Sequence, residues 1–371
     1  MMERWKVMKK ICLLLCVILL TGCANKTSVQ NNIQEENEYS YVYETDCQCN
    51  IGLHPNRAYT QKGMYYFEVL SENMVLRFVD KQSGKDVPVC GKADCNHTNL
   101  ECDAYFSKKD YPLNNLWYLE DMLYVPKVED DYINIEKITP DGAQRTNSCT
   151  LTRLFIETID MGNGVVESST TYPEIQLHRG YAYISTYYPG EENASLYRIK
   201  LGENDEPEEL ATIEEKNNGM VMLYRIKPYG GSILFQMGEY KESGNTVSIY
   251  EYNLLTETCS LLCENVIKDY AVLYGELYYL DENENIYKMN LDTNEKELYY
   301  ANDNRVKNAL STFNTFFEYD GNIVFRREIE EITEAGEIQV YWIQLLLDDE
   351  GNIIDEIDID GNELLPEYYI E

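Results

Sequence analysis

Three cysteines and one histidine lie within the short segment Cys90–Cys102. Their order is Cys90, four residues, Cys95, one residue, His97, four residues, Cys102. Three thiolates and one imidazole are a known closed, four-coordinate ligand set for structural zinc. Lys92, inside the segment, would offset part of the thiolate charge. The segment is therefore a candidate metal site, and structural zinc is the one cofactor that the sequence suggests.

Disulfides are the competing interpretation of the same cysteines. The spacing departs from the paired CxxC knuckles of many zinc sites, and an exported protein meets an oxidising environment. Cys90–Cys95 or Cys95–Cys102 would then be bridged, and Cys47 or Cys49 would take the remaining thiol. Free thiols are the third alternative, and the sequence leaves all three open.

The first 22 residues have the pattern of an export signal. Basic side chains in Met1–Lys10 precede the apolar run Ile11–Leu20, which is too short to span a bilayer but typical of a signal-peptide core. Leu20-Thr21-Gly22-Cys23 resembles the bacterial lipobox. That resemblance implies cleavage before Cys23 and a diacylglycerol on its thiol, so we expect a lipid-anchored protein on the extracytoplasmic face of the cell membrane.

Charge and composition divide the remainder of the chain. Residues 23–38 have almost no apolar side chains and predict a flexible linker, and residues 39–371 supply the folded domain.

The whole chain has 65 Asp and Glu against 31 Lys and Arg, a formal net charge of -34. This acidity argues against nucleic acid as a partner, because nucleic-acid binding depends on basic side chains that neutralise phosphates.

The stretch Gly275–Tyr300 shows the structural unit from which the folded domain is made. It predicts three short strands at Leu277–Leu280, Ile286–Leu291 and Glu297–Tyr300, separated by polar turns. Side chains alternate between the faces of a strand, and both faces of Leu277–Leu280 are apolar. We therefore expect this sheet to lie between two others, as a blade does in a β-propeller.

The same pattern occurs six times. A turn residue followed by an apolar strand, which we expect to be the inner strand, recurs at Gly63, Asp121, Gly180, Gly231, Gly275 and Gly321, so that successive copies begin 44 to 59 residues apart. That spacing is typical of four-stranded blades with insertions. The predicted fold is all-β, a six-bladed β-propeller, with seven blades as the alternative. Arg153–Thr171 has no counterpart in the repeat.

These copies, GELYYLD and NIYKMNLDT above all, resemble the repeat of six-bladed propellers of the YWTD and TolB-like kind. They also resemble bacterial propeller lipoproteins of unassigned function, and the Cys90–Cys102 block is similar to one in clostridial members of that group. The resemblance implies the fold and not a function, because propellers support both binding and catalysis. The Trp-Thr-Asp core of the YWTD repeat is nowhere intact.

A closed ring needs its last blade to be completed. Tyr39–Glu44 is a strand-like run well placed for this role, and Ile353–Ile359 competes for it. Closure would bring Cys47 and Cys49 near the loop that carries Cys90–Cys102. We therefore expect a disulfide or zinc crosslink there to fasten the seam of the ring.

An acidic stretch near the C-terminus comes close to a calcium-binding EF-hand loop. Glu356, Asp358, Asp360 and Glu367 occupy positions one, three, five and twelve of that loop, with Gly361 at position six. Position one is usually Asp, and strand-like runs flank the stretch where an EF-hand has helices. A hairpin turn at Asp360-Gly361 explains it better.

No catalytic motif stands out. The chain has three histidines and lacks GxSxG, HExxH and P-loop sequences. We expect His178 to serve a turn, although it could face the central channel. The sequence favours a binding or scaffold protein for a protein or glycan partner. The alternative is a glycan-acting hydrolase or lyase with carboxylates in the channel, which ionisable side chains converging there with raised pKa values would support.

Overall fold

The computed structural model describes residues 40, 56–99, 101–162, 165–186, 193–203, 206–214, 220–241, 244–302, 309–319, 322–333 and 336–360. Every regular element in these ranges is a β-strand. No helix in the described part of the chain is long and apolar enough to cross a membrane. The residues expected to form the signal and linker, 1–38, lie outside these ranges, and so does Cys23.

Six antiparallel sheets follow one another along the chain, and each comes from one continuous segment. The first contains β1 (Arg57–Thr60), β2 (Gly63–Val69), β3 (Asn73–Asp80), β4 (Asp86–Pro88) and β5 (Tyr105–Ser107). The second contains β6 (Trp117–Leu119), β7 (Met122–Glu129), β8 (Tyr132–Ile138) and β9 (Arg145–Arg153). The third contains β12 (Ile175–His178), β13 (Tyr181–Thr186), β14 (Asn193–Lys200) and β15 (Glu208–Glu214).

The last three sheets have four strands each. The fourth contains β16 (Met220–Tyr229), β17 (Ser232–Lys241), β18 (Gly244–Asn253) and β19 (Thr258–Cys263). The fifth contains β20 (Ile267–Leu273), β21 (Glu276–Leu280), β22 (Ile286–Asn290) and β23 (Lys296–Tyr300). The sixth contains β24 (Ala309–Tyr319), β25 (Asn322–Ile332), β26 (Ile338–Leu347) and β27 (Ile353–Asp360).

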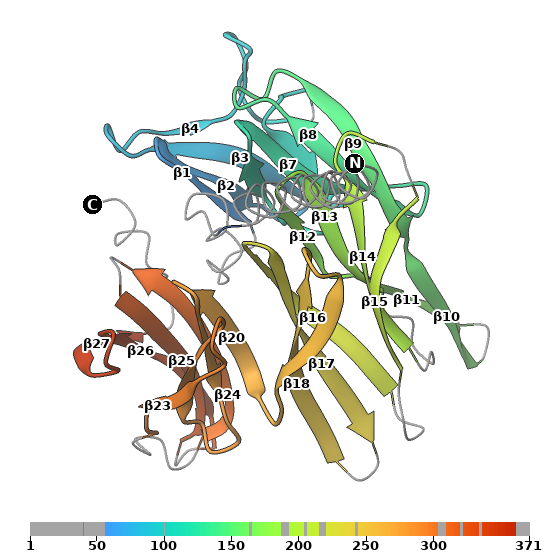
Figure 1. Cartoon of the computed structure of the whole chain (residues 1–371). Coiled ribbons are helices and arrows are strands. Elements are labelled where there is room, and N and C mark those ends of the chain that lie inside the picture. The colour runs from blue at the N-terminus through green and yellow to red at the C-terminus, as the bar shows by residue number, and fades with distance from the viewer. Residues whose placement is uncertain are drawn as a thin grey trace, which may run out of the picture.

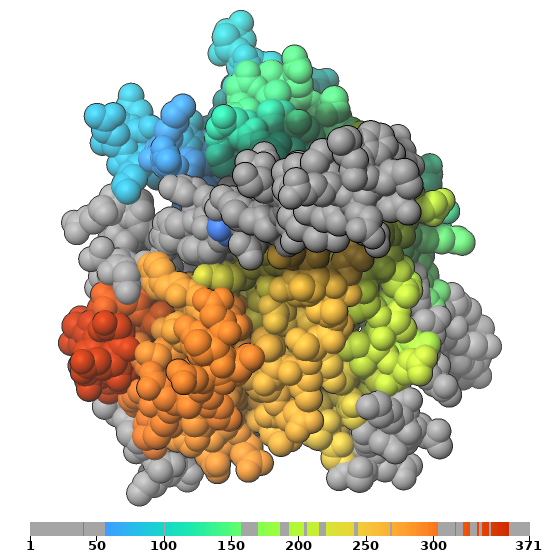
Figure 2. Space-filling view, viewed as in Figure 1, coloured from blue at the N-terminus to red at the C-terminus, as the bar shows by residue number. Residues whose placement is uncertain are grey.

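The sheets form a six-bladed β-propeller. Their colours run in chain order around the molecule, from blue at the top to red at the lower left (Figure 1). In the space-filling view the gold fourth sheet lies between the yellow-green third and the orange fifth (Figure 2). The first strands of neighbouring sheets contact one another, β1 with β6, β12 with β16, β16 with β20 and β20 with β24. The first strands are therefore the inner strands of the blades.

The repeated sequence pattern marks the second strand of each sheet, so its assignment to the inner strand was wrong. At Asp121, Gly180, Gly231 and Gly275 the turn residue is the second residue of a two-residue hairpin between the first and second strands, whereas Gly63 is already the first residue of β2. In Glu120-Asp121, Arg179-Gly180 and Tyr274-Gly275 both residues have positive φ, between 46° and 81°. Two-residue hairpins favour this backbone because its twist matches that of the strands. Gly and Asp recur there because they adopt it at low cost.

The core lies between the sheets. Five clusters of buried apolar side chains each join two consecutive sheets, from the first and second to the fifth and sixth. In β21, Leu277 and Tyr279 pack toward the fourth sheet, and Tyr278 and Leu280 toward the sixth. The prediction that this strand is buried on both faces is confirmed.

Two further expectations concern the ends of the repeat. Ile353–Asp360 forms β27, the outer strand of the sixth sheet, so this segment completes the last blade. Tyr39–Glu44 lies outside the described residues except for Ser40. Phe155–Gly162 (β10) and Val165–Thr171 (β11) form a separate hairpin, which explains why this stretch has no counterpart in the repeat.

Candidate metal centre

The predicted cysteine cluster lies where the outer strand of the first blade is interrupted. β4 and β5 both pair with β3, β4 at Arg77–Val79 and β5 at Asn73–Val75. The insertion 89–104 separates them, and both of its ends bind the backbone of Leu76. The Val89 N–H donates to the Leu76 carbonyl at 2.9 Å, and the Leu76 N–H donates to the Ala104 carbonyl at 2.8 Å. The insertion thus leaves and rejoins the sheet at one point.

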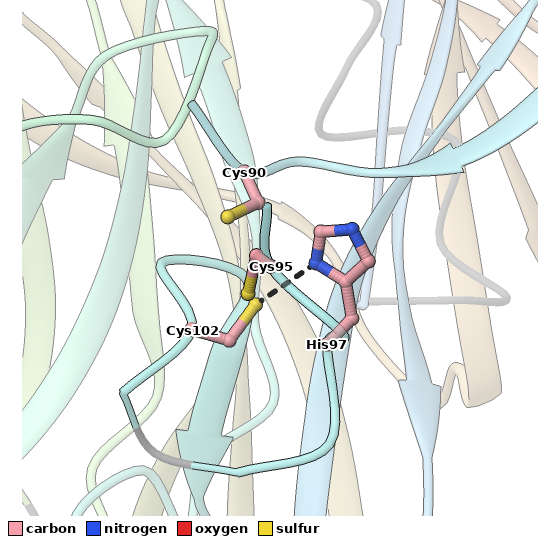
Figure 3. A group of neighbouring side chains, drawn as sticks. All are labelled: Cys90, Cys95, His97 and Cys102. Carbon is pink, nitrogen blue, oxygen red and sulfur yellow. Dashed lines mark hydrogen bonds between the residues drawn. The ribbon is translucent and has the colours of Figure 1, made fainter. Parts of the chain in front are cut away.

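The structure brings all four predicted residues together within this insertion. One ligand atom from each of Cys90, Cys95, His97 and Cys102 lies within 4.8 Å of the others. Their side chains point toward one another (Figure 3). His97 Nδ1 lies 3.2 Å from Cys102 Sγ. Cys102 is buried and the other three side chains are half-buried, so the set is largely shielded from water.

Short turns place the ligands. The Cys95 N–H donates to the Lys92 carbonyl and the Cys102 N–H to the Asn99 carbonyl, at 3.3 and 3.0 Å. His97 has a φ of 54°, a left-handed conformation uncommon for residues other than glycine. That conformation turns the chain between Cys95 and Cys102, so the imidazole is in reach of the sulfurs.

The surroundings act differently on two of the thiols. Burial acts to raise the pKa of Cys90, but hydrogen bonds from the backbone of Lys92 and Asp103 and from neighbouring thiols outweigh it and hold that pKa below its ordinary value. Burial raises the pKa of Cys102 to about 12. The Ala104 N–H donates to Cys102 Sγ at 3.3 Å, and Lys92 forms an ion pair with Asp103 at 2.9 Å. A cation bound among the sulfurs would favour the ionised form of all three cluster thiols.

The insertion and the adjoining strand β5 also contact the second sheet. The Arg145 guanidinium lies 3.9 Å from the centre of the Phe106 ring and donates a hydrogen bond to the Asp103 carbonyl. Gly91 packs so closely on Ala143 that a Cβ at Gly91 would lie 3.2 Å from that of Ala143. Cys47 and Cys49 lie outside the described residues, so their part in the cluster and the fastening of the seam stay predictions.

The stretch that resembles a calcium-binding loop does not form one in the described residues. Glu356, Asp358 and Asp360 belong to β27, where the backbone is extended and not coiled into a loop, and Glu367 lies outside the described residues. An extended strand spreads residues 356 and 360 roughly 13 Å apart along the chain, which does not suit an EF-hand.

His178 is buried, and its Nε2 lies 3.1 Å from the Gly230 carbonyl. It joins the third blade to a turn of the fourth, which agrees with a structural role.

Sequence reasoning missed a charged network at the inner strands of the fourth and fifth blades. Asp269 on β20 is buried and lies 2.7 Å from Arg225 Nη1 and 3.0 Å from Lys227 Nζ, both on β16. Burial acts to raise the pKa of Asp269, but Lys227 and Arg225 outweigh it and lower that pKa. Lys227 also donates to the Tyr270 carbonyl. The available signal was the presence of charged residues, Arg225 and Lys227 in β16 and Asp269 in β20, within largely apolar strands.

Glu174, just before β12, extends this network to the third blade. Its carboxylate accepts hydrogen bonds from the backbone N–H groups of Arg225 and Ile226, the latter at 2.8 Å. These residues lie in a bulge of β16, where Arg225 has a φ of 53°. Burial raises the pKa of Glu174. Three inner strands are thus tied together by ionisable side chains that bind protein groups.

A small cavity of about 210 Å³ lies between the second and third blades. Glu120, Tyr124, Lys137, Thr146 and Asn147 supply its wall from the second blade. Turns at the edge of the third blade form the opposite wall of the cavity. In one of these turns the Gly202 N–H donates a hydrogen bond to the Ser148 carbonyl at 3.0 Å. The cavity thus offers hydrogen-bonding groups of several kinds beside a largely buried aromatic ring.

Comparison with known proteins establishes the fold alone. No protein-family model and no curated protein matches the chain. Among solved structures it resembles a prolyl endopeptidase, with a TM-score of 0.50 and 10% identity over 88% of this chain. The chain spans 45% of that protein's length.

Two other solved structures are more distantly similar. An oligogalacturonate lyase in complex with manganese gives a TM-score of 0.39 at 10% identity, covering 84% of this chain and 91% of the other. A chain of a nidogen–laminin complex gives 0.34 at 14% identity, covering 65% and 76%.

Proposed function

We propose that this protein is a lipid-anchored extracytoplasmic β-propeller that binds a partner and does not turn over a substrate. The observation that carries this proposal is the pairing of the central charges. Asp269 is bound by Arg225 and Lys227, and Glu174 by two backbone N–H groups. A carboxylate whose oxygens are already bound to protein is poorly placed to exchange protons with a substrate. These side chains hold blades together.

The cavity between the second and third blades supports a glycan as the partner. Its volume is below the range of about 300–1,000 Å³ usual for sites that enclose a drug-sized ligand, so it suits one unit of a longer chain. Tyr124 is largely buried and contributes little surface, whereas Lys137 and Asn147 can donate hydrogen bonds to hydroxyls and Glu120 can accept them. A protein partner that presents a polar side chain is the other candidate from the sequence.

Binding of purified cell-surface polysaccharides, measured by calorimetry, tests this function. We expect saturable binding to the full chain, and at least about a tenfold weaker affinity for Lys137→Ala, because a hydrogen bond from a charged group contributes about 1.5–3 kcal/mol. Lys85→Ala is the matched control, since Lys85 is an exposed lysine in a turn of the first blade. Equal affinities of both variants would contradict the assignment of the cavity.

The hydrolase or lyase alternative depends on Glu174, whose raised pKa suits a general acid. Incubation with the same polysaccharides, followed by chromatography of the products, separates the two functions. We expect intact polysaccharide. Fragments that appear with the native protein and are absent with Glu174→Gln would establish the enzyme and refute the binding proposal.

A further inference from the structure

We propose that Cys90, Cys95, His97 and Cys102 bind one zinc ion, and that this ion holds the interrupted outer strand of the first blade on β3. The site is structural, and its ligands all come from the insertion 89–104. It is independent of the partner-binding function proposed above.

The geometry of the four donors fits a tetrahedral ion. Zinc–sulfur bonds of about 2.3 Å and zinc–nitrogen bonds of about 2.0 Å place two sulfurs roughly 3.8 Å apart, and a sulfur and a nitrogen roughly 3.5 Å apart. All four donors here lie within 4.8 Å of one another, and His97 Nδ1 is 3.2 Å from Cys102 Sγ. Small rotations of side chains suffice to reach bonding distances.

The donor set also indicates which metal binds and in what role. Three thiolates and one imidazole in a tetrahedral arrangement favour zinc over the hard cations calcium and magnesium, which take oxygen ligands. Four protein ligands leave no position for water or substrate, so the ion is structural and not catalytic.

A disulfide explains the clustering of these four side chains less well than a metal ion does. A bridge consumes two of the three thiols and brings their sulfurs to about 2.05 Å. The third thiol and the imidazole would then remain in a shielded cluster with no common partner. A single cation binds all four donors at once, including the imidazole, which a disulfide does not need.

The neighbouring groups form a second shell suited to a bound thiolate–metal centre. The Ala104 N–H donates to Cys102 Sγ at 3.3 Å, the kind of outer contact that orients a metal ligand. Three thiolates and one Zn²⁺ leave one net negative charge. Lys92 lies beside the cluster in an ion pair with Asp103, and its ammonium group can offset that charge.

The position in the fold explains what the ion stabilises. β4 and β5 are three residues each, and strands so short contribute few ladder hydrogen bonds. Cys90 follows β4 closely and Cys102 closely precedes β5. A metal that joins them closes the insertion at its base, where Val89 and Ala104 both bind Leu76. Both short strands are thereby held against β3.

Metal analysis of the full chain, purified anaerobically without chelator, tests the proposal. We expect one zinc per chain by mass spectrometry, and three more thiols that react with a disulfide reagent after chelation than before it. Cys95→Ser and His97→Ala should each lose most of the zinc. Cys259→Ser is the control, because Cys259 is an exposed free cysteine on β19, outside the cluster. It should keep the metal.

A second measurement covers the case in which cluster variants fail to fold. Native protein is stripped with chelator under reductant and titrated with Co²⁺, which shows visible absorption typical of tetrahedral thiolate coordination. Saturation at one Co²⁺ per chain, displacement by Zn²⁺ and a rise in melting temperature on zinc addition are expected. A reduced protein that takes up neither metal, or an anaerobic preparation whose cluster thiols appear only after reductant, would overturn the zinc site.

Discussion

The Asp269 carboxylate on the inner strand of the fifth blade lies 3.0 Å from the Lys227 ammonium on the inner strand of the fourth. Both side chains are buried, and Arg225 Nη1 lies 2.7 Å from the same carboxylate. Two sheets that pack largely through apolar side chains are thus joined at their inner strands by a charged contact. Removing one member of such an ion pair leaves the opposite charge buried without its partner.

Lys227→Met should therefore destabilise the propeller by about 3–5 kcal/mol, because removal of one partner leaves the Asp269 charge buried with only part of its compensation. Urea unfolding followed by intrinsic fluorescence measures this change. Lys288→Met is the matched control, since Lys288 pairs across strands with the largely exposed Glu297 at 2.9 Å. Exposed pairs contribute about 0–1 kcal/mol. Equal effects of the two changes would show that the buried pair has no special role.

The same aspartate predicts how stability depends on pH. Its pKa is lowered in the folded protein, so it stabilises the fold above the ordinary aspartate pKa of about 3.9 and loses that contribution as pH falls through the lower folded value. We expect the stability difference between the native protein and Asp269→Asn to be constant near neutral pH and to shrink below about pH 4. Unfolding curves at pH 7, 5, 4 and 3 would reveal this; a difference that stays constant would contradict the lowered pKa.

Lipid attachment has a direct test. Cys23→Ser removes the thiol that the lipobox resemblance marks for acylation, so the protein should leave the membrane fraction or remain unprocessed. Fractionation with immunoblotting, and mass spectrometry of the N-terminus, measure both outcomes. Cys12→Ser, within the apolar core of the expected signal, is the control. Normal membrane retention of a cleaved Cys23→Ser protein would refute the anchor.

The β10–β11 hairpin should be dispensable for folding. These strands pair with each other and with none of the six sheets. Replacing residues 156–170 with a short Gly-Ser linker should change the melting temperature by no more than a few degrees. Differential scanning calorimetry checks this. Removal of the β22–β23 hairpin, an integral part of the fifth sheet, provides the contrast and should abolish cooperative unfolding.

Local patterns in the sequence account for the parts of this structure that could be predicted. Strand alternation around Tyr278 and the spacing of Cys90, Cys95 and His97 are each contained in a short stretch, so the blade and the cluster were both foreseeable. The repeated pattern was assigned to the inner strand of each blade, but it lies on the second strand. The conspicuous turn residues follow the inner strands and do not precede them. The pair of Lys227 and Asp269 could not be predicted, since the two residues are 42 positions apart and bulges in both strands set how they meet.

Each of the six sheets is made from one uninterrupted stretch of chain, with no strand exchanged between the first and sixth sheets in the described residues. Strand pairing within each sheet therefore needs no residue from a distant part of the chain. A nascent chain could complete one blade before the next is synthesised, and each finished blade would offer an apolar face to its successor. The order of synthesis thus coincides with the order of assembly around the ring.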